Sequence, residues 1–204
     1  MIYEKEIFKS AMQLMDNKDI IVLGIDGLGG AGKSTISEKI CNEFENKMFH
    51  TILLHIDDFI HIREIRYNSS YPEWQCYYKL QWRYDYFTDV INALKQSINI
   101  EQEIELYDKD NDCYSIKSYF VKNKTVIVVE GIFLQRKELQ GLFDYMVYID
   151  VPEEVRMCRV LKRDTYIGNE QQITDKYENR YFPAERHYFN KYSPDRKADF
   201  IICN

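Results

Sequence analysis

A glycine-rich segment near the N-terminus has the residue types and the spacing that hold phosphate groups. Residues 27–34 read G-L-G-G-A-G-K-S and match the pattern G-x-x-x-x-G-K-[ST]. Glycines accept positive φ angles and let backbone N–H groups approach phosphate oxygens, while Lys33 adds a full positive charge. Ser34 offers a hydroxyl group to Mg²⁺. The predicted nucleotide-phosphate site consists of Gly27, Gly29, Gly30, Ala31, Gly32, Lys33, Ser34 and Thr35.

Acidic residues that follow two of the apolar runs could supply the carboxylates for phosphoryl transfer. Asp57 and Asp58 follow a predicted strand at 51–56, and Glu130 follows another at 125–129. The carboxyl ends of parallel strands line the ligand crevice, where a carboxylate can accept a hydroxyl proton or hold a metal. We expect Mg²⁺ to be held by Ser34, Asp57 and Glu130. Strand alternation predicts that Asp57 and Asp58 point to opposite sides.

The elements that must position these residues are short apolar runs that alternate with amphipathic segments. The predicted strands are 19–25, 51–56, 125–129, 145–151 and 199–203. The predicted helices are about 3–17, 33–47, 84–97, one from Pro152 onwards, and 170–191 with a break near Pro183. Residues 61–80 are expected to be irregular, and 109–124 to form a loop or a hairpin. Buried strands that alternate with helices predict an α/β fold with a parallel sheet.

Composition sets bounds on the class of protein. The 204 residues fit one domain spanning 1–204, and 45% hydrophobic with 29% charged residues is ordinary for a globular protein. A net charge of -6 disfavours a nucleic-acid polymer as partner. Five scattered cysteines without a CxxC spacing fit a reducing compartment. No apolar run reaches about 18 residues, so we expect a cytoplasmic chain without a membrane span.

Six segments of the chain occur in the order seen in uridine kinases, which the chain resembles over roughly residues 20–203. That group includes phosphoribulokinase-like and nicotinamide riboside kinase relatives. The segments are Gly27–Thr35, Asp57-Asp58-Phe59, residues 104–108, Glu130-Gly131-Ile132, Arg163-Asp164 and residues 198–202. The phosphate loop is generic, whereas the ordered combination is more specific. The resemblance implies a five-stranded parallel sheet of order 2-3-1-4-5 with helices on both faces, and a mobile lid at about 159–172.

The resemblance also assigns roles on the phosphate side of the site. It implies ATP as phosphate donor, Mg²⁺ as cofactor and a small-molecule acceptor. Asp57 takes the role of catalytic base, with Lys33 and Arg163 as further catalytic residues and Glu130 beside the metal. It places Arg159 with Arg163 near the ATP phosphates. These two arginines are four residues apart on a predicted helix and therefore share a face.

On the acceptor side the resemblance points to Asp85, Tyr107 and Arg180. Asp85 follows Tyr84 as in a Phe-Asp step that opens the substrate-side helix, although an aspartate there could equally cap the helix. Uridine kinases usually have Pro-Val-Tyr-Asp where this chain has residues 105–108, Glu-Leu-Tyr-Asp. Their His-Ser-Arg that follows is replaced by residues 114–117, Tyr-Ser-Ile-Lys. Those elements help to hold the pyrimidine nucleoside, so the acceptor's identity stays open.

The expected function is ATP- and Mg²⁺-dependent phosphoryl transfer to a hydroxyl of a small molecule, with a nucleoside as first candidate. A kinase of another alcohol, such as a phosphorylated sugar or pantothenate, is the second candidate. A nucleotide-binding regulator without transfer activity is the third, but Asp57, Glu130 and Arg163 favour the enzyme. The sequence leaves open the preference between ATP and GTP, the oligomeric state, and whether Asp57 acts mainly as base or as metal ligand.

Overall fold

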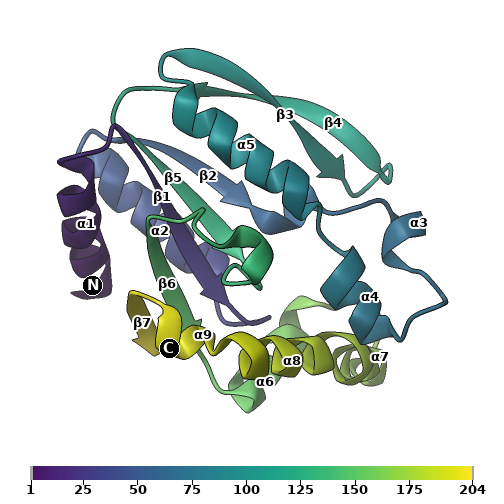
Figure 1. The fold of residues 1–204 in the computed structure, drawn as a ribbon. Coiled ribbons are helices and arrows are strands. Elements are labelled where there is room, and N and C mark those ends of the chain that lie inside the picture. The colour runs from purple at the N-terminus through teal and green to yellow at the C-terminus, as the bar shows by residue number, and fades with distance from the viewer. Residues whose placement is uncertain (1, 204) are drawn as a thin grey trace.

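The structure is a computed structural model that describes residues 2–203. A five-stranded parallel sheet of order β2-β5-β1-β6-β7 forms its centre (Figure 1). The strands are β1 (Ile20–Gly27), β2 (His50–His55), β5 (Thr125–Gly131), β6 (Tyr145–Asp150) and β7 (Phe200–Cys203). Counted along the chain within this sheet, the order is 2-3-1-4-5. The predicted fold class is therefore confirmed.

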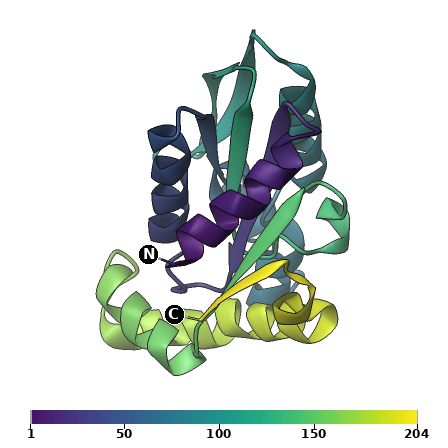
Figure 2. The same ribbon diagram turned by 90° about the vertical axis from the view of Figure 1, so that its left-hand side faces the viewer.

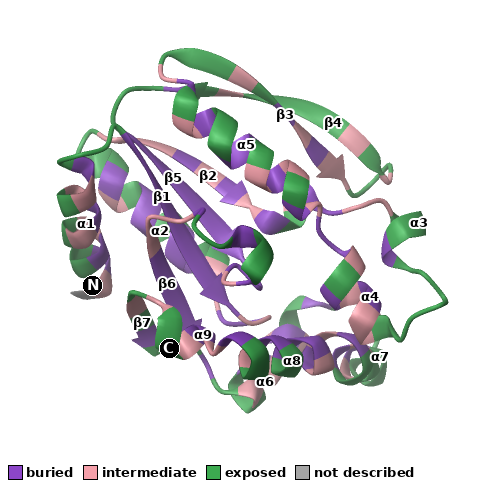
Figure 3. Cartoon of the chain, in the orientation of Figure 1, coloured by how far each residue is buried: buried purple, intermediate pink, exposed green. Residues whose placement is uncertain are grey.

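Helices on both faces explain why the central strands are apolar along their whole length. One face packs against α1 (Ile2–Met15) and α2 (Lys33–Asn46), which Figure 2 shows side by side, and the other packs against α5 (Tyr84–Gln96). Successive residues of β5 divide between them, since Val128 joins the core with Phe44 while Val129 joins the core with Phe87. Every residue of β1 and β5 is buried (Figure 3).

The middle of the chain contains more regular structure than the sequence predicts. Strands β3 (Ile100–Asp108) and β4 (Cys113–Val121) pair as an antiparallel hairpin, so the loop alternative for 109–124 is wrong and the hairpin alternative is right. The strand periodicity is weak because most of β4 is exposed. Residues 61–80, expected to be irregular, contain α3 (Arg63–Arg66) and α4 (Glu73–Leu80). The buried Cys76 and Tyr78 anchor α4, and its aromatic run obscures a helical pattern.

The C-terminal third lies across the carboxyl ends of the strands. It consists of α6 (Glu153–Arg163), α7 (Glu170–Lys176), a π-helical turn at Tyr177–Tyr181, α8 (Phe182–Tyr192) and α9 (Pro194–Lys197). The helix break predicted near Pro183 corresponds to the π-helical turn at Tyr177–Tyr181. Proline has no backbone N–H, so Pro183 cannot continue the regular hydrogen bonds of an α-helix. Within residues 2–203, no helix combines the length and apolar content needed to cross a bilayer.

Candidate active site

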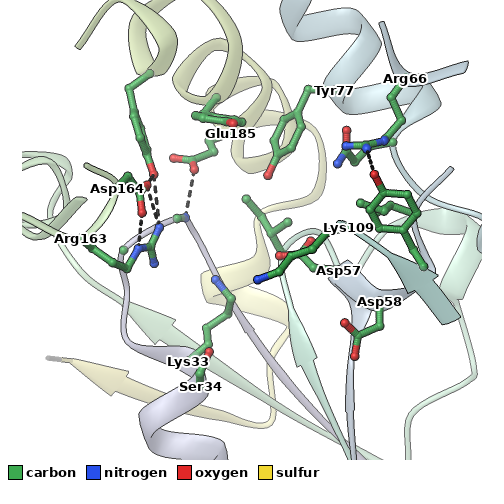
Figure 4. A pocket seen from close by; sticks show the side chains of 18 of the residues that line it. Lys33, Ser34, Asp57, Asp58, Arg66, Tyr77, Lys109, Arg163, Asp164 and Glu185 are labelled. Carbon is green, nitrogen blue, oxygen red and sulfur yellow. Dashed lines mark hydrogen bonds and ion pairs between the residues drawn. The ribbon is translucent and has the colours of Figure 1, made fainter. Parts of the chain in front are cut away.

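A cavity of about 550 Å³ opens where β1, β2 and β5 end. The register aligns His55 of β2 with Glu130 of β5, and Ile25 of β1 with the same Glu130, so the three strand ends meet at one edge. Figure 4 shows the side chains that these ends, the C-terminal helices and the hairpin direct into the cavity. The lining residues that the sequence also singles out are Gly29, Gly30, Lys33, Ser34, Asp57, Tyr107, Glu130 and Arg163.

The phosphate-loop segment forms a tight turn between β1 and α2. Gly30 and Gly32 have φ angles of 80° and 92°, in the left-handed region that favours glycine. A Cβ at Gly30 would lie 2.9 Å from Cγ1 of Val160, because the loop packs against α6. Lys33 donates from Nζ to the carbonyl oxygen of Leu28 over 3.2 Å. The loop therefore has the backbone shape that a phosphate cradle requires. Its remaining predicted members, Gly27, Ala31, Gly32 and Thr35, do not line the cavity.

Oxygen donors gather beside the loop. Ser34 donates from Oγ to Oε1 of Glu130 over 3.1 Å, and the same Oε1 lies 2.6 Å from Nδ1 of His55. Burial raises the pKa of Glu130, but the His55 hydrogen bond and the charge of Lys33 outweigh it, so the pKa lies below its ordinary value. Hydroxyl and carboxylate oxygens of this kind are the ligands that Mg²⁺ prefers.

Asp57 lines the cavity together with Lys33 and Lys109 (Figure 4). Its Oδ1 accepts a hydrogen bond from Nε1 of Trp82 at 3.3 Å. Asp57 is reached by solvent through the cavity, yet the surrounding protein desolvates its carboxyl group. This desolvation and the nearby charge of Glu130 raise the pKa of Asp57, against the opposing effect of Lys33. A raised pKa makes the carboxylate a stronger proton acceptor.

The predicted contrast between Asp57 and Asp58 is wrong. Strand β2 ends at His55, and residues Ile56–Phe59 form a 3₁₀ turn, η1. A pleated strand alternates its side chains between two faces, whereas a 3₁₀ turn rotates successive side chains by about a third of a circle. Both aspartates consequently line the cavity, from neighbouring directions.

Arg159 and Arg163, which the resemblance places near the ATP phosphates, have different surroundings although both lie on α6. Arg163 lines the cavity with a side chain that is 61% exposed, and it donates to Asp164 over 2.6 Å. Arg159 lies outside the cavity, where its Nη1 is 3.4 Å from the carbonyl oxygens of Gly30 and Ala31. Arg163 is therefore exposed to the cavity while paired with Asp164, whereas Arg159 contacts the phosphate loop from outside the cavity.

Of the three residues predicted on the acceptor side, one lines the cavity and two lie outside it. Tyr107 lines the cavity, and its hydroxyl accepts from Arg66 over 2.7 Å and donates to Asp112 over 2.8 Å. Asp85 does not line the cavity, because it is exposed on the face of α5 opposite the buried core residues. Arg180 is buried outside the cavity and donates to the Glu73 carbonyl and to Oε1 of Gln81. The π turn directs Arg180 toward α4, away from a ligand.

A buried ion pair that was not predicted from the sequence forms hydrogen bonds to the phosphate loop. Glu185 of α8 accepts from the Gly29 N–H over 2.9 Å and from Arg156 of α6 over 2.7 Å. Arg156 also donates to the Gly29 carbonyl oxygen over 3.0 Å. Burial raises the pKa of Glu185 against the pull of Arg156. In the sequence, both residues resemble the polar residues of surface helices. Their contact with Gly29 follows only from the way in which α6 and α8 pack.

Replacing Arg156 with methionine should lower the free energy of unfolding by about 3–5 kcal/mol, because the buried Glu185 then lacks a positively charged partner. The two side chains of this pair are 3% and 1% exposed. Arg186→Met is the matched control, since Arg186 pairs with Glu153 across the same two helices with side chains 51% and 35% exposed. Its loss should cost less than about 1 kcal/mol. Urea denaturation measures both, and equal losses would contradict the assigned role of the buried pair.

Comparison with known proteins adds family information to this geometry. The model of the phosphoribulokinase / uridine kinase family matches residues 22–202. A uridine kinase of Bacillus subtilis is 30% identical over 194 residues, covering 91% of this chain and 86% of the relative. A uridine kinase of Staphylococcus carnosus is 27% identical over 184 residues, with coverage of 89% and 86%.

Solved structures agree with these sequence matches. The structure of a possible uridine kinase from Bacillus stearothermophilus superposes with a TM-score of 0.77 at 29% identity, covering 99% of this chain and all of that one. A D-glycerate 3-kinase from Cryptococcus neoformans has a TM-score of 0.51 at 13% identity, with coverage of 88% and 79%, and this likeness concerns the fold alone.

Proposed function

The chain belongs to the phosphoribulokinase / uridine kinase family, and we propose that it transfers the γ-phosphoryl group of ATP, with Mg²⁺, to a hydroxyl group of a small molecule. A nucleoside is the first candidate acceptor, because the curated relatives are named uridine kinases. The observation that carries the proposal is one cavity that joins the phosphate loop, Lys33, Asp57, Glu130 and Arg163.

The donor end of the cavity fits a magnesium nucleotide. The left-handed Gly30 and Gly32 shape the loop, and α2 begins at Lys33 with its positive end directed at the loop. Ser34, Asp57 and Glu130 would hold the metal through oxygen atoms, directly or through water. When bound, Mg²⁺ neutralises charge on the transferring phosphate.

The chain's own residues then supply positioning and charge. Lys33 and Arg163 would bind oxygens of the terminal phosphates and stabilise the charge that spreads over them during transfer. Asp57 would orient the acceptor hydroxyl toward the phosphorus and accept its proton as the new bond forms. Because the transition state is loose, we expect alignment to contribute more than nucleophile activation.

An acceptor panel tests this proposal and separates it from a nucleotide-binding regulator. We expect ADP formation to rise well above the rate without acceptor for at least one alcohol among nucleosides, sugar phosphates and pantothenate. The measurement is coupled ADP release with Mg²⁺ and ATP, with each acceptor omitted in turn as the blank. Tight ATP binding together with no acceptor-dependent ADP from any member would favour the regulator and overturn the kinase assignment of this cavity.

A further inference from the structure

The end of the cavity opposite Arg163 is lined by three cationic side chains. They are Arg63 and Arg66 of α3 and Lys109, which follows β3. In Figure 4 the ammonium group of Lys109 points into the cavity near Asp57, and Arg66 lies beyond it. The Arg66 guanidinium group contacts the Tyr107 ring. These three residues lie outside the phosphate loop, and none of the roles assigned above to ATP or metal binding uses them.

Arg66 is the strongest sign of a ligand at this end. The residue is 7% exposed, and its Nε has no hydrogen-bond partner anywhere in residues 2–203. Its Nη2 donates to Tyr107, and its nearest carboxylate oxygen, in Asp112, is 3.8 Å away. The guanidinium group lies 4.8 Å from the Tyr107 ring centroid and 5.6 Å from that of Tyr67. A buried cation with an unpaired N–H is costly unless an anion completes its shell.

The acidic groups near this end do not fill that role. Asp112 already accepts hydrogen bonds from the Arg63 backbone N–H over 2.9 Å and from Tyr107 over 2.8 Å. Asp58 is the other carboxylate on this side of the cavity. Among residues 2–203, neither carboxylate is therefore a hydrogen-bond partner of the Arg66 Nε.

The order of the groups along the cavity relates this cluster to the reaction. In Figure 4 Arg163 lies at one end of the cavity and Arg66 at the other, with Lys33, Asp57 and the ammonium group of Lys109 between them. The phosphate loop and Lys33 mark the donor end, and Asp57 marks the place of the reacting hydroxyl. A molecule that presents its hydroxyl to Asp57 therefore extends toward Lys109 and Arg66.

We propose that the acceptor is an alcohol that carries a phosphate or carboxylate group, and that Arg66, with Arg63 and Lys109, binds this anion while the hydroxyl lies at Asp57. The inference rests on the proposed kinase function and specifies its acceptor. A planar guanidinium with a free Nε matches the paired oxygens of either anion. An uncharged nucleoside offers the guanidinium only neutral acceptor oxygens, which pair with it less strongly than an anion does, so it is the poorer acceptor.

Matched pairs of alcohols test the charge requirement and separate the two anions. Ribulose 5-phosphate with ribulose tests a phosphate, pantothenate with panthenol tests a carboxylate, and uridine represents a neutral nucleoside. We expect the anionic member of at least one pair to exceed its neutral partner, and uridine, by about ten- to a hundredfold in kcat/KM. If a neutral acceptor reacts at least as well as every anionic one, the inference falls and the kinase function stands. If none reacts, the kinase function itself fails.

Substitutions locate the effect at this cluster. Arg66→Met should remove the preference for the anionic member. Because Arg66 is buried, circular dichroism should be used to check that Arg66→Met is folded. Two milder variants, Arg66→Lys and Lys109→Ala at an exposed lysine, provide further tests. Each should reduce kcat/KM for the anionic acceptor by about tenfold. Lys122→Ala, at an exposed lysine outside the cavity, is the control that should change neither class. Unchanged preference in folded Arg66→Lys and Lys109→Ala would overturn the proposal.

Binding without turnover gives an independent readout. A non-hydrolysable ATP analogue with Mg²⁺ first fills the phosphate loop, and calorimetry then follows binding of the preferred anionic acceptor. We expect binding to weaken about tenfold or more in Lys109→Ala and to be unchanged in Lys122→Ala. Equal binding in both variants would show that the anion does not use this end of the cavity.

Discussion

Replacing Lys33 with alanine should reduce phosphoryl transfer by about a thousandfold or more and weaken nucleotide binding at least tenfold. Lys33 is the only lysine or arginine of residues 27–35. It lines the cavity and donates to the Leu28 carbonyl oxygen, so its charge is held at the loop before any nucleotide arrives. Neither Arg163 at one end nor Lys109 at the other can replace a charge on the loop itself.

The control for this variant is Lys39→Ala, because Lys39 lies on the same helix, α2, but is exposed to solvent. It removes one charge of the same sign without touching the cavity, so turnover and nucleotide affinity should stay near the wild-type values. Steady-state ADP release and calorimetry with the ATP analogue measure both variants. Normal turnover in Lys33→Ala would show that the glycine-rich loop does not hold the donor phosphates.

Replacing Asp57 with asparagine should lower kcat by about a hundredfold or more, in the range of general-base loss. Asparagine keeps the shape and can still accept the hydrogen bond that Trp82 donates to Oδ1. It cannot take the proton of the acceptor hydroxyl. Nucleotide affinity should change little if Asp57 acts mainly as base. If Asp57 chiefly holds the metal, kcat should recover partly at high Mg²⁺ concentration.

Asp58→Asn is the comparison for this variant. The two aspartates lie on a 3₁₀ turn, so strand alternation does not point them to opposite sides. Both line the cavity, but the charge of Lys33 acts on Asp57, whereas Asp58 lies to one side in Figure 4. We therefore expect Asp58→Asn to be the milder change. A steady-state assay with the same acceptor ranks the two variants. Severe loss in Asp58→Asn with nearly normal Asp57→Asn would show that the other carboxylate is the base.

The sequence predicts the fold well because the deciding signals are local. The strand at β1 is an apolar run that leads straight into residues 27–34, so strand, loop and helix are encoded side by side. The full burial of β5 follows from a run of β-branched residues. The hairpin β3–β4 is less visible, since it packs on one side only and keeps polar residues on the other.

The candidate site is less predictable because several of its features depend on how elements pack. A 3₁₀ turn after β2, which no residue pattern marks, brings Asp58 into the cavity. The π turn before α8 directs Arg180 away from the cavity. Arg66 and Glu185 gain their surroundings from residues distant in sequence, Tyr107 in one case and Gly29 in the other. The lid at about 159–172 remains a prediction, as does the single domain.

The central claim is that this cavity moves the γ-phosphoryl group of ATP onto an alcohol. The most direct measurement supplies ATP radiolabelled at the γ-phosphate, Mg²⁺ and the alcohols of the matched pairs to wild-type protein, Lys33→Ala and Asp57→Asn. Separation of the products then shows where the label resides. We expect the label in a phosphorylated organic product with wild-type protein, and a strongly reduced amount with both variants. Label that appears only as inorganic phosphate, or an organic product formed equally by all three proteins, would contradict the account.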